Sequence, residues 1–377
     1  MRCGEEKKKL KEKVKKMIEN IREYMYSKFG ENWFAKEEEG IPAMAQNKRR
    51  VITLYVLRET IGPMIDRSDD PESTITLVMQ LDSGIEKEIV EIPARKFKSK
   101  EKLMGLKLCR MFNVIDPRYE YNKVKEIPYL GNPNSAIFGD SVVEGGDAGQ
   151  AMLPSRVFYS SSYSIRSRPD ITKQLTHNSL SEAGTMWDRS TGTNRTSLFN
   201  TEYIIPGVFF PSFITIRNPT PETLIHIILS LRERSYGAQT SITGPNIKNN
   251  IVGIYCGEEE LPITSYTVSR DMQSKLNDKL TNDSLREMIN DYVLNSMDGA
   301  EKGKLTSKDD LNDFLKWIDH LSSSELSEVY NSLKEDANEL IKYANIVNPE
   351  KSERRSKPKG KNKKEEKGEK DGTSEEL

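Results

Sequence analysis

The segment from Ser197 to Cys256 constrains the fold of this chain more than any other part of its sequence. It contains a β-rich run, a sharply capped helix, a loop of glycine and small polar residues, and a short apolar strand. Thr220-Pro221-Glu222 predicts the helix start, with a hydroxyl N-cap, a proline at the first helical position and an acid in the first turn. The helix is apolar around most of its girth, which predicts burial. This order is typical of the strand–helix–strand half of an α+β sandwich.

The loop after this helix reads YGAQTSITGPN. Loops of glycine and small polar residues bring backbone N–H groups and hydroxyls within reach of phosphates. It is not a P-loop, because no lysine follows Gly244. The alternative is a plain connection that uses glycine for its geometry. We favour phosphate contact, through Tyr236, Gly237, Gln239, Thr240, Ser241 and Thr243.

The rest of the core is predicted from a few segments. Arg49–Glu59 and Arg156–Arg166 have strand patterns, and Lys98–Phe112 has the pattern of a helix. The resulting order of strand, helix, strands, helix and strand predicts an α+β fold with a ferredoxin-like, or RRM-like, core that carries large insertions. The aromatic signature of RNA-recognition domains is missing, so any RNA is expected to be held by its phosphates rather than by base stacking on the sheet.

Four regions are predicted along the chain. Residues 1–47 form a basic amphipathic helix and loop, which either packs on its own domain or lies on a polyanion. Residues 48–257 form the RRM-like core with inserted hairpins and a long polar excursion at 155–200. Residues 258–347 form an appended, acidic α-helical region, and residues 348–377 form a disordered, charged tail.

Charge is segregated along the chain, although the formal net charge is only -1. Arg95–Lys125 contains 10 basic and 3 acidic residues, whereas Glu258–Pro349 contains 10 basic and 19 acidic residues. Such asymmetry indicates a polyanion on one surface and a different contact on another.

Basic side chains supply the remaining candidates for RNA contact. For each cluster of them, the alternative is that the charges only face solvent and bind nothing. They lie in the strip Arg95–Arg110, at the start of the first strand, and in the excursion. The predicted residues are Lys48, Arg49, Arg50, Arg58, Arg95, Lys96, Lys98, Lys100, Lys102, Lys107, Arg110, Arg156, Arg166, Arg168 and Lys173.

Signals for an enzyme are poor. His177 is the only one of the three histidines placed to act as an acid or base, and no nucleophile or metal motif occurs. The three isolated cysteines support neither a zinc ribbon nor a disulfide framework, and no apolar run reaches membrane length. We therefore expect a cytoplasmic protein that is not an enzyme and that needs no cofactor or metal.

Several stretches resemble a known family. They are VLRET at Val56–Thr60, FKSKEKLMGLKLCR at Phe97–Arg110, SYSIRS at Ser162–Ser167, and TEYIIPGVFFPSFITIRNPTPE at Thr201–Glu222 continuing into RSYGAQTSITG. Over about Arg49–Gly257 the chain resembles the guide-RNA-sheathing backbone subunit of type I-D CRISPR-Cas effector complexes, which are Cascade-like, within the repeat-associated RNA-binding superfamily.

The resemblance implies an antiviral ribonucleoprotein. Copies of the subunit would stack along a CRISPR guide RNA (crRNA) while the spacer bases pair with target DNA. The implied partners are further copies of the chain, a large nuclease-bearing subunit and a second repeat-associated subunit. One alternative is an RNA endonuclease of the same superfamily that acts on the guide precursor or the target. Another is a general single-strand RNA-binding protein outside any CRISPR system.

Overall fold

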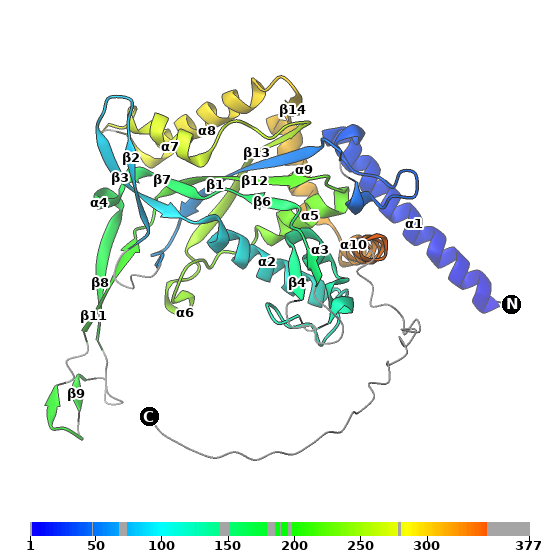
Figure 1. Cartoon of the computed structure of the whole chain (residues 1–377), viewed down its shortest axis with the longest axis horizontal. Helices are drawn as coiled ribbons and strands as arrows, with labels where there is room; N and C mark the ends of the chain where they lie inside the picture. The colour runs from blue at the N-terminus through cyan, green and yellow to red at the C-terminus, as the bar shows by residue number, and fades with distance from the viewer. Residues whose placement is uncertain are drawn as a thin grey trace, which may run out of the picture.

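A five-stranded antiparallel sheet forms the centre of the protein (Figure 1). The computed structural model describes residues 2–46, 48–67, 74–124, 126–142, 151–178, 185–188, 190–194, 198–277 and 280–344. The strand order is β14-β13-β1-β12-β6, and every neighbouring pair is antiparallel. The strands are β1 (Val51–Thr60), β6 (Val157–Tyr159), β12 (Phe209–Arg217), β13 (Ile247–Gly257) and β14 (Gly303–Leu305).

Two helices connect the central strands and pack together on one face of the sheet. Helix α2 (Ala94–Met111) lies between β1 and β6 in the chain, and α5 (Pro221–Ser230) connects β12 to β13. The side chain of Thr220 accepts a hydrogen bond from the Thr223 N–H, and every residue of α5 is buried. The predicted helix start and the predicted burial are both confirmed.

The opposite face of the sheet is covered as well. Helices α7 (Ser265–Gln273) and α8 (Asn282–Asp298) pack on Tyr55, Leu57 and Phe213, which point to this side. The rings of Tyr55 and Phe213 stack with centroids 5.5 Å apart. These aromatic residues belong to a hydrophobic core, so they are not free to stack on bases.

Four more helices pack on the face of the sheet that α2 and α5 cover. Helices α1 (Arg2–Phe29), α3 (Pro133–Phe138), α9 (Lys308–His320) and α10 (Ser323–Tyr343) contribute to a single hydrophobic cluster with β1 and α5. The 258–347 region therefore divides its helices between the two faces of the sheet instead of standing apart from it. Within the described residues, 3-10 helices occur at Glu31–Trp33, Ala43–Ala45 and Ile127–Leu130.

The insertions form smaller sheets around this centre. The patterns of Ser73–Leu81 and Glu86–Ile92, with a turn at Asp82–Gly84, predict a hairpin, and β2 (Thr76–Gln80) and β3 (Glu86–Ile92) form it. Strand β3 also pairs with β7 (Ser162–Ser167). An arm of paired strands projects away from the body (Figure 1). The arm contains β8 (Thr172–Asn178), β9 (Trp187–Asp188), β10 (Thr193–Asn194) and β11 (Leu198–Ile204). Other short elements are α4 (Arg168–Ile171), α6 (Thr240–Thr243), β4 (Asp140–Val142) and β5 (Ala151–Leu153).

One strand position differs from expectation. The prolines in Tyr203–Ile216 predict an edge or bent strand. The run is divided at Pro206 between β11 and β12, and β12 lies inside the sheet between β1 and β6, not at its edge. Pro211 is tolerated because β6 pairs only with Ile214–Ile216, which leaves Pro211 with one sheet neighbour, Leu57. The predicted tail, 348–377, lies outside the described residues.

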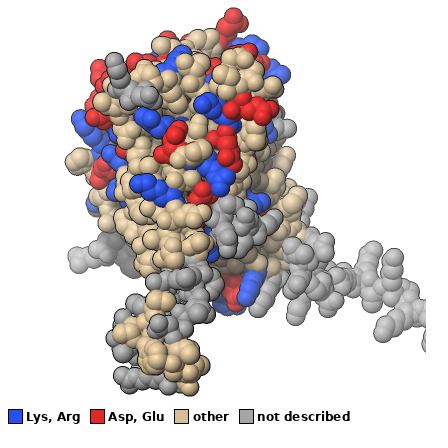
Figure 2. All heavy atoms as spheres, turned by 90° about the vertical axis from the view of Figure 1, so that its left-hand side faces the viewer, with Lys and Arg blue, Asp and Glu red and all other residues tan. Residues whose placement is uncertain are grey.

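No helix within the described ranges is long and apolar enough to cross a bilayer. On the face shown in Figure 2, basic and acidic side chains are interspersed over the body of the protein. No large single-sign surface is visible on the described part of this face.

Candidate nucleic-acid interface

One face of α2 presents cationic side chains to solvent. Arg95, Lys107 and Arg110 are exposed and Lys100 is half-buried. Lys107 and Arg110 lie three residues apart and share this face of the helix. Among the described residues Arg95 and Lys100 have no ion pair, and Lys107 pairs with Glu233 at 3.5 Å. Arg110 donates to the Tyr119 carbonyl at 3.4 Å. We call Arg95, Lys100, Lys107 and Arg110 the basic stripe.

The other lysines of α2 are engaged within the protein. The Lys98 ammonium donates to Ser155 Oγ at 2.7 Å, and Lys102 donates to the Gly139 carbonyl at 2.7 Å. Burial lowers the pKa of both ammonium groups, with the neighbouring Lys102 adding to the effect on Lys98. Lys96 donates to Asp66 at 2.5 Å. These three lysines therefore hold α2 against the body, and their contact with RNA stays a prediction.

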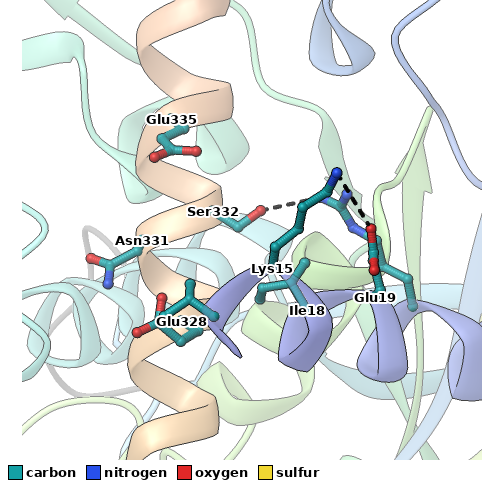
Figure 3. A pocket seen from close by; sticks show the side chains of 9 residues that line it. Lys15, Ile18, Glu19, Glu328, Asn331, Ser332 and Glu335 are labelled. Carbon is teal, nitrogen blue, oxygen red and sulfur yellow. Dashed lines mark hydrogen bonds and ion pairs between the residues drawn. The ribbon is translucent and has the colours of Figure 1, made fainter. Parts of the chain in front are cut away.

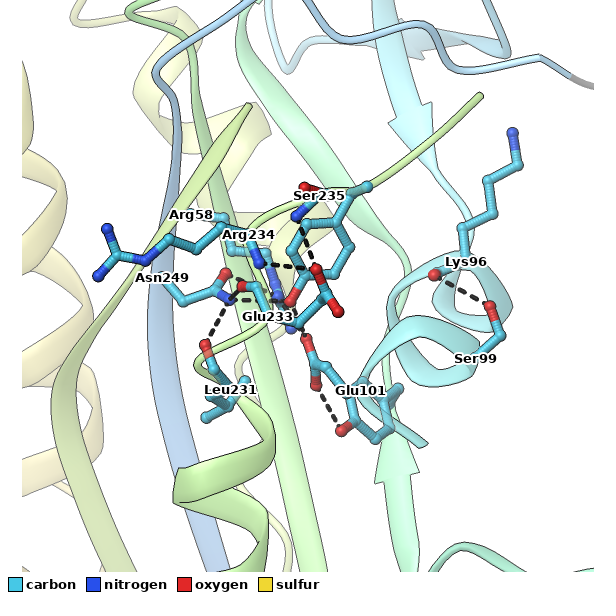
Figure 4. A network of polar contacts seen from close by, with 11 residues as sticks. Arg58, Lys96, Ser99, Glu101, Leu231, Glu233, Arg234, Ser235 and Asn249 are labelled. Atoms are coloured by element: carbon cyan, nitrogen blue, oxygen red, sulfur yellow. Dashed lines mark hydrogen bonds and ion pairs between the residues drawn. The ribbon is translucent and has the colours of Figure 1, made fainter. Parts of the chain in front are cut away.

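A buried polar network lies beneath this surface (Figure 4). Arg58 and Glu101 are fully buried and form an ion pair at 2.6 Å. Glu101 also accepts hydrogen bonds from the hydroxyls of Tyr159, at 2.5 Å, and Tyr236, at 2.9 Å. Burial, followed by the Glu101 charge, raises the pKa of both tyrosines well above the ordinary value. Burial opposes the charge of Arg58, yet Glu101 raises the pKa of its guanidinium.

Burial removes Arg58 and Tyr236 from the set of RNA contacts. The Arg58 guanidinium lies 3.9 Å from the centroid of the Phe97 ring, inside the protein. A phosphate cannot reach either side chain in this structure. Their role is structural, and the prediction of direct contact from these two residues is wrong.

The network fixes the connection between α5 and β13. The Asn249 amide donates to the carbonyls of Leu231 and Glu233 and to the Tyr236 hydroxyl, at 2.8, 3.1 and 2.8 Å. Arg58 donates to the Asn249 oxygen at 2.8 Å. The two ends of the 231–249 connection are thereby joined to α2 through a single set of hydrogen bonds.

Glycine is required at the start of the predicted phosphate loop. Gly237 has φ +78°, and a Cβ there would lie 2.3 Å from the Ile65 carbonyl oxygen. Gln239 and Ser241 are exposed and Thr240 is half-buried, so these positions remain candidates for phosphate contact. Thr243 donates to the Gln239 carbonyl at 3.0 Å and is buried, which directs it inward.

The same connection carries cations that the sequence analysis omitted. Arg232, Arg234 and Lys248 are exposed, and Arg232 pairs with Asp319 at 2.6 Å. The Glu233 carboxylate accepts hydrogen bonds from the backbone N–H groups of Arg234 and Ser235 (Figure 4). The sequence feature that could have indicated Arg232, Arg234 and Lys248 is their position beside the glycine-containing loop.

The other predicted cations do not join this surface. Lys48 and Arg50 pair with Glu38, and the exposed Arg49 lies 3.5 Å from Glu259. Arg168 pairs with Glu88 and Glu202, at 2.7 and 3.1 Å, so it stabilises the base of the arm.

The structure also separates the cations of the excursion. Burial lowers the pKa of Arg156 to about 10. Arg166 donates to the Leu280 carbonyl at 3.3 Å, and Lys173 is exposed on the arm. These cations thus differ in burial and in partners, and their joint contact with RNA stays a prediction.

Two of the three histidines have described side chains, and neither belongs to this surface. His226 is buried, lies 3.0 Å from the Tyr330 hydroxyl, and has its pKa lowered to about 3 by burial. His320 Nδ1 contacts the Lys316 carbonyl at 2.6 Å on an exposed helix end. The side chain of His177 lies outside the described residues. Within those residues, no group of three or more His, Cys, Asp or Glu side chains is arranged to hold a metal ion.

Comparison with known proteins places the chain in a family. It belongs to the Csc2 CRISPR family, whose model, described as Csc2 Crispr, matches residues 38–340. The matched range includes the basic stripe and the 231–249 connection. No curated protein matches the chain.

The fold is shared with a solved member of the family. The crystal structure of Csc2 from Thermofilum pendens aligns with a TM-score of 0.57 at 12% identity, covering 86% of this chain and 98% of that one. A chain described as part of a CRISPR RNA-guided surveillance complex aligns with a TM-score of 0.44 at 11% identity, covering 78% and 99%. A chain of a type IV-B CRISPR complex has a TM-score of 0.38 at 13% identity, covering 60% and 100%.

Proposed function

We propose that this protein is a non-catalytic backbone subunit that holds CRISPR guide RNA by its phosphates in a type I-D interference complex. Membership in the Csc2 CRISPR family over residues 38–340 is the observation that carries the proposal. The basic stripe and the exposed part of the 231–249 connection supply a surface for a polyanion within the matched range.

We infer that the core is ferredoxin-like. If β1, β6, β12 and β13 are numbered as the first to fourth core strands, their order in the sheet is 4-1-3-2. The crossover helices α2 and α5 occupy the positions that this fold requires. In RRM domains, bases stack on the open face of such a sheet, but α7 and α8 cover that face here. RNA contact through phosphates on the α2 side is therefore favoured.

Binding through exposed lysines and arginines predicts little preference for base sequence, because phosphates are the same at every position. A backbone subunit that serves many guides needs this property. We propose direct contact from the basic stripe, from Gln239, Thr240 and Ser241, and from Arg234 and Lys248. The buried Arg58–Glu101 network would act by positioning these groups.

The remaining assignments follow from the family resemblance. We propose that successive copies assemble head-to-tail along the guide, with target DNA pairing to its bases. A large nuclease-bearing subunit and a second repeat-associated subunit would complete the complex. Opposite charge on Arg95–Lys125 and on Glu258–Pro349 supports a heterologous contact between neighbouring copies, which does not have to close into a dimer.

We expect protein purified from its host to retain RNA transcribed from a CRISPR repeat array, and to leave that RNA uncut with Mg²⁺ or Mn²⁺. The test is sequencing of the bound RNA, followed by incubation of labelled guide and target strands with the wild type and a His177→Ala variant. Bound RNA unrelated to repeats would contradict the proposal. Divalent-dependent cleavage that is lost in the variant would instead favour the endonuclease alternative.

A further inference from the structure

An acidic cleft runs between α1 and α10, and none of the residues proposed above for RNA contact line it. Two adjoining cavities of about 410 and 380 Å³ share Arg22, Ser332 and Glu335. Figure 3 shows the first cavity, where Lys15, Ile18 and Glu19 face residues of α10. The two cavities are lined by seven carboxylates and three cationic side chains, so the cleft carries a marked negative charge. We call this pair of cavities the acidic cleft.

The cations of the cleft leave most of its carboxylates unpaired. Arg22 donates from Nε to Glu222 Oε1 at 2.6 Å and from Nη2 to Ser332 at 3.2 Å. Lys15 pairs with Glu19 at 3.8 Å, and Lys36 pairs with Glu31, which does not line the cleft. Among the described residues, the lining carboxylates of α10, which are Glu328, Glu335, Asp336 and Glu339, have no ion pair.

Buried oxygens at the bottom of the cleft lack hydrogen-bond partners. Glu222 is fully buried, and its Oε2 atom has no partner among the described residues. The same holds for Asp336 Oδ2, and burial, followed by the Glu222 charge, raises the pKa of Asp336 to about 7. Both side chains line the second cavity. Unpaired buried acceptors are costly, so the site is suited to a ligand with several cationic N–H donors.

The chain itself carries such a ligand directly after α10. Residues 351–364 read KSERRSKPKGKNKK and contain eight lysines and arginines against one glutamate. Helix α10 ends at Tyr343, and the helical rise places Glu335 about 12 Å before that end. The seven residues from 344 to 350 span up to about 24 Å when extended, which is enough to return along α10. Tethering of this kind gives an effective concentration on the order of millimolar.

We propose that residues 351–364 dock in the acidic cleft of the same molecule. Lysine and arginine side chains of this segment would lie against the carboxylates of α10, and a guanidinium would satisfy the unpaired oxygens of Glu222 and Asp336. The occupant is the chain's own segment because its charge complements the cleft and its tether reaches it. The contact does not depend on RNA, so it stands or fails separately from the function proposed above.

The test is trypsin cleavage of the full-length protein, followed by intact-mass spectrometry. Cleavage of an opening segment tracks the population of the open form, so a segment that is docked about 90% of the time is cut about tenfold more slowly. We expect Glu335→Lys with Glu339→Lys, or 0.5 M NaCl, to remove this protection. Both glutamates are exposed on α10, and thermal melting verifies that the variant folds. The cleavage rate of a synthetic peptide of residues 351–364, measured at both salt concentrations, corrects for the effect of salt on trypsin itself.

Matched control variants are available on other surfaces. Glu287→Lys with Glu301→Lys makes the same change of charge at two exposed positions outside the cleft, and is expected to keep the protection. Equal cleavage rates in the wild type and the cleft variant would overturn the proposal, as would equal acceleration in the control. Protection that disappears on dilution would also overturn it, because the segment would then dock on a second molecule.

Discussion

Replacing Arg58 with alanine is expected to lower the free energy of unfolding by about 3–5 kcal/mol, because it leaves the buried Glu101 carboxylate without a counter-ion. Arg58 and Glu101 both have fully buried side chains. The loss is a large fraction of the roughly 5–15 kcal/mol that stabilises a typical protein. Urea denaturation monitored by circular dichroism measures it, provided that the variant still folds.

The combination of Arg58→Met with Glu101→Gln is the matched comparison. It removes both charges and keeps an acceptor oxygen for one of the hydroxyls of Tyr159 and Tyr236, while the other hydroxyl can accept from the new amide NH2 group. We therefore expect it to lose much less stability than Arg58→Ala. A loss below about 1 kcal/mol for Arg58→Ala would show that the ion pair does not hold the fold. A double variant as unstable as the single one would show that the size of Arg58, rather than its charge, is what matters.

Charge reversal of the basic stripe is expected to weaken RNA binding by at least tenfold without destabilising the fold. The variant combines Arg95→Glu, Lys107→Glu and Arg110→Glu, three exposed positions on one face of α2. Each lost phosphate contact lowers the slope of log affinity against log salt by about 0.7 for single-stranded RNA, so three contacts lower it by about 2. The loss should be equal on unrelated RNA sequences, because phosphates carry no sequence information.

The control for this experiment reverses the same number of charges elsewhere. Lys87, Lys308 and Lys316 are exposed and lie on β3 and α9, outside α2. Their replacement by glutamate is expected to leave the salt slope nearly unchanged. An unchanged slope in the stripe variant would remove α2 from the interface. Lys98 and Lys102 are unsuitable for this test, because their bonds to Ser155 and Gly139 mean that their loss would destabilise the fold.

The elements of the core could be predicted because their signals are local. Thr220-Pro221 marks the start of α5, and the turn at Asp82–Gly84 marks the β2–β3 hairpin. The arrangement of helices from the 258–347 region could not be predicted in this way. Each of those helices has one apolar face, and nothing local indicates which side of the sheet covers it.

The candidate site was predicted less well, because the partners of its charges are distant in sequence. The lysine-rich strip has few acids nearby, which favours free cations, yet Lys102 lies 3.6 Å from Asp140 and Arg58 pairs with Glu101. Arg168 likewise finds Glu202 across the arm. Periodicity along α2 places Lys98 and Lys102 on the same side of the helix as Arg95, which is exposed, so spacing alone does not indicate which of these cations are buried.

Assembly on RNA of increasing length tests the proposed function most directly. Native mass measured on RNAs lengthened in small steps should show protomers added one at a time, with a fixed number of nucleotides for each additional copy. That result would establish a subunit that sheathes a guide by repeated heterologous contacts. A constant mass, such as one dimer at every RNA length, would contradict the proposal that this protein forms the backbone of a CRISPR complex.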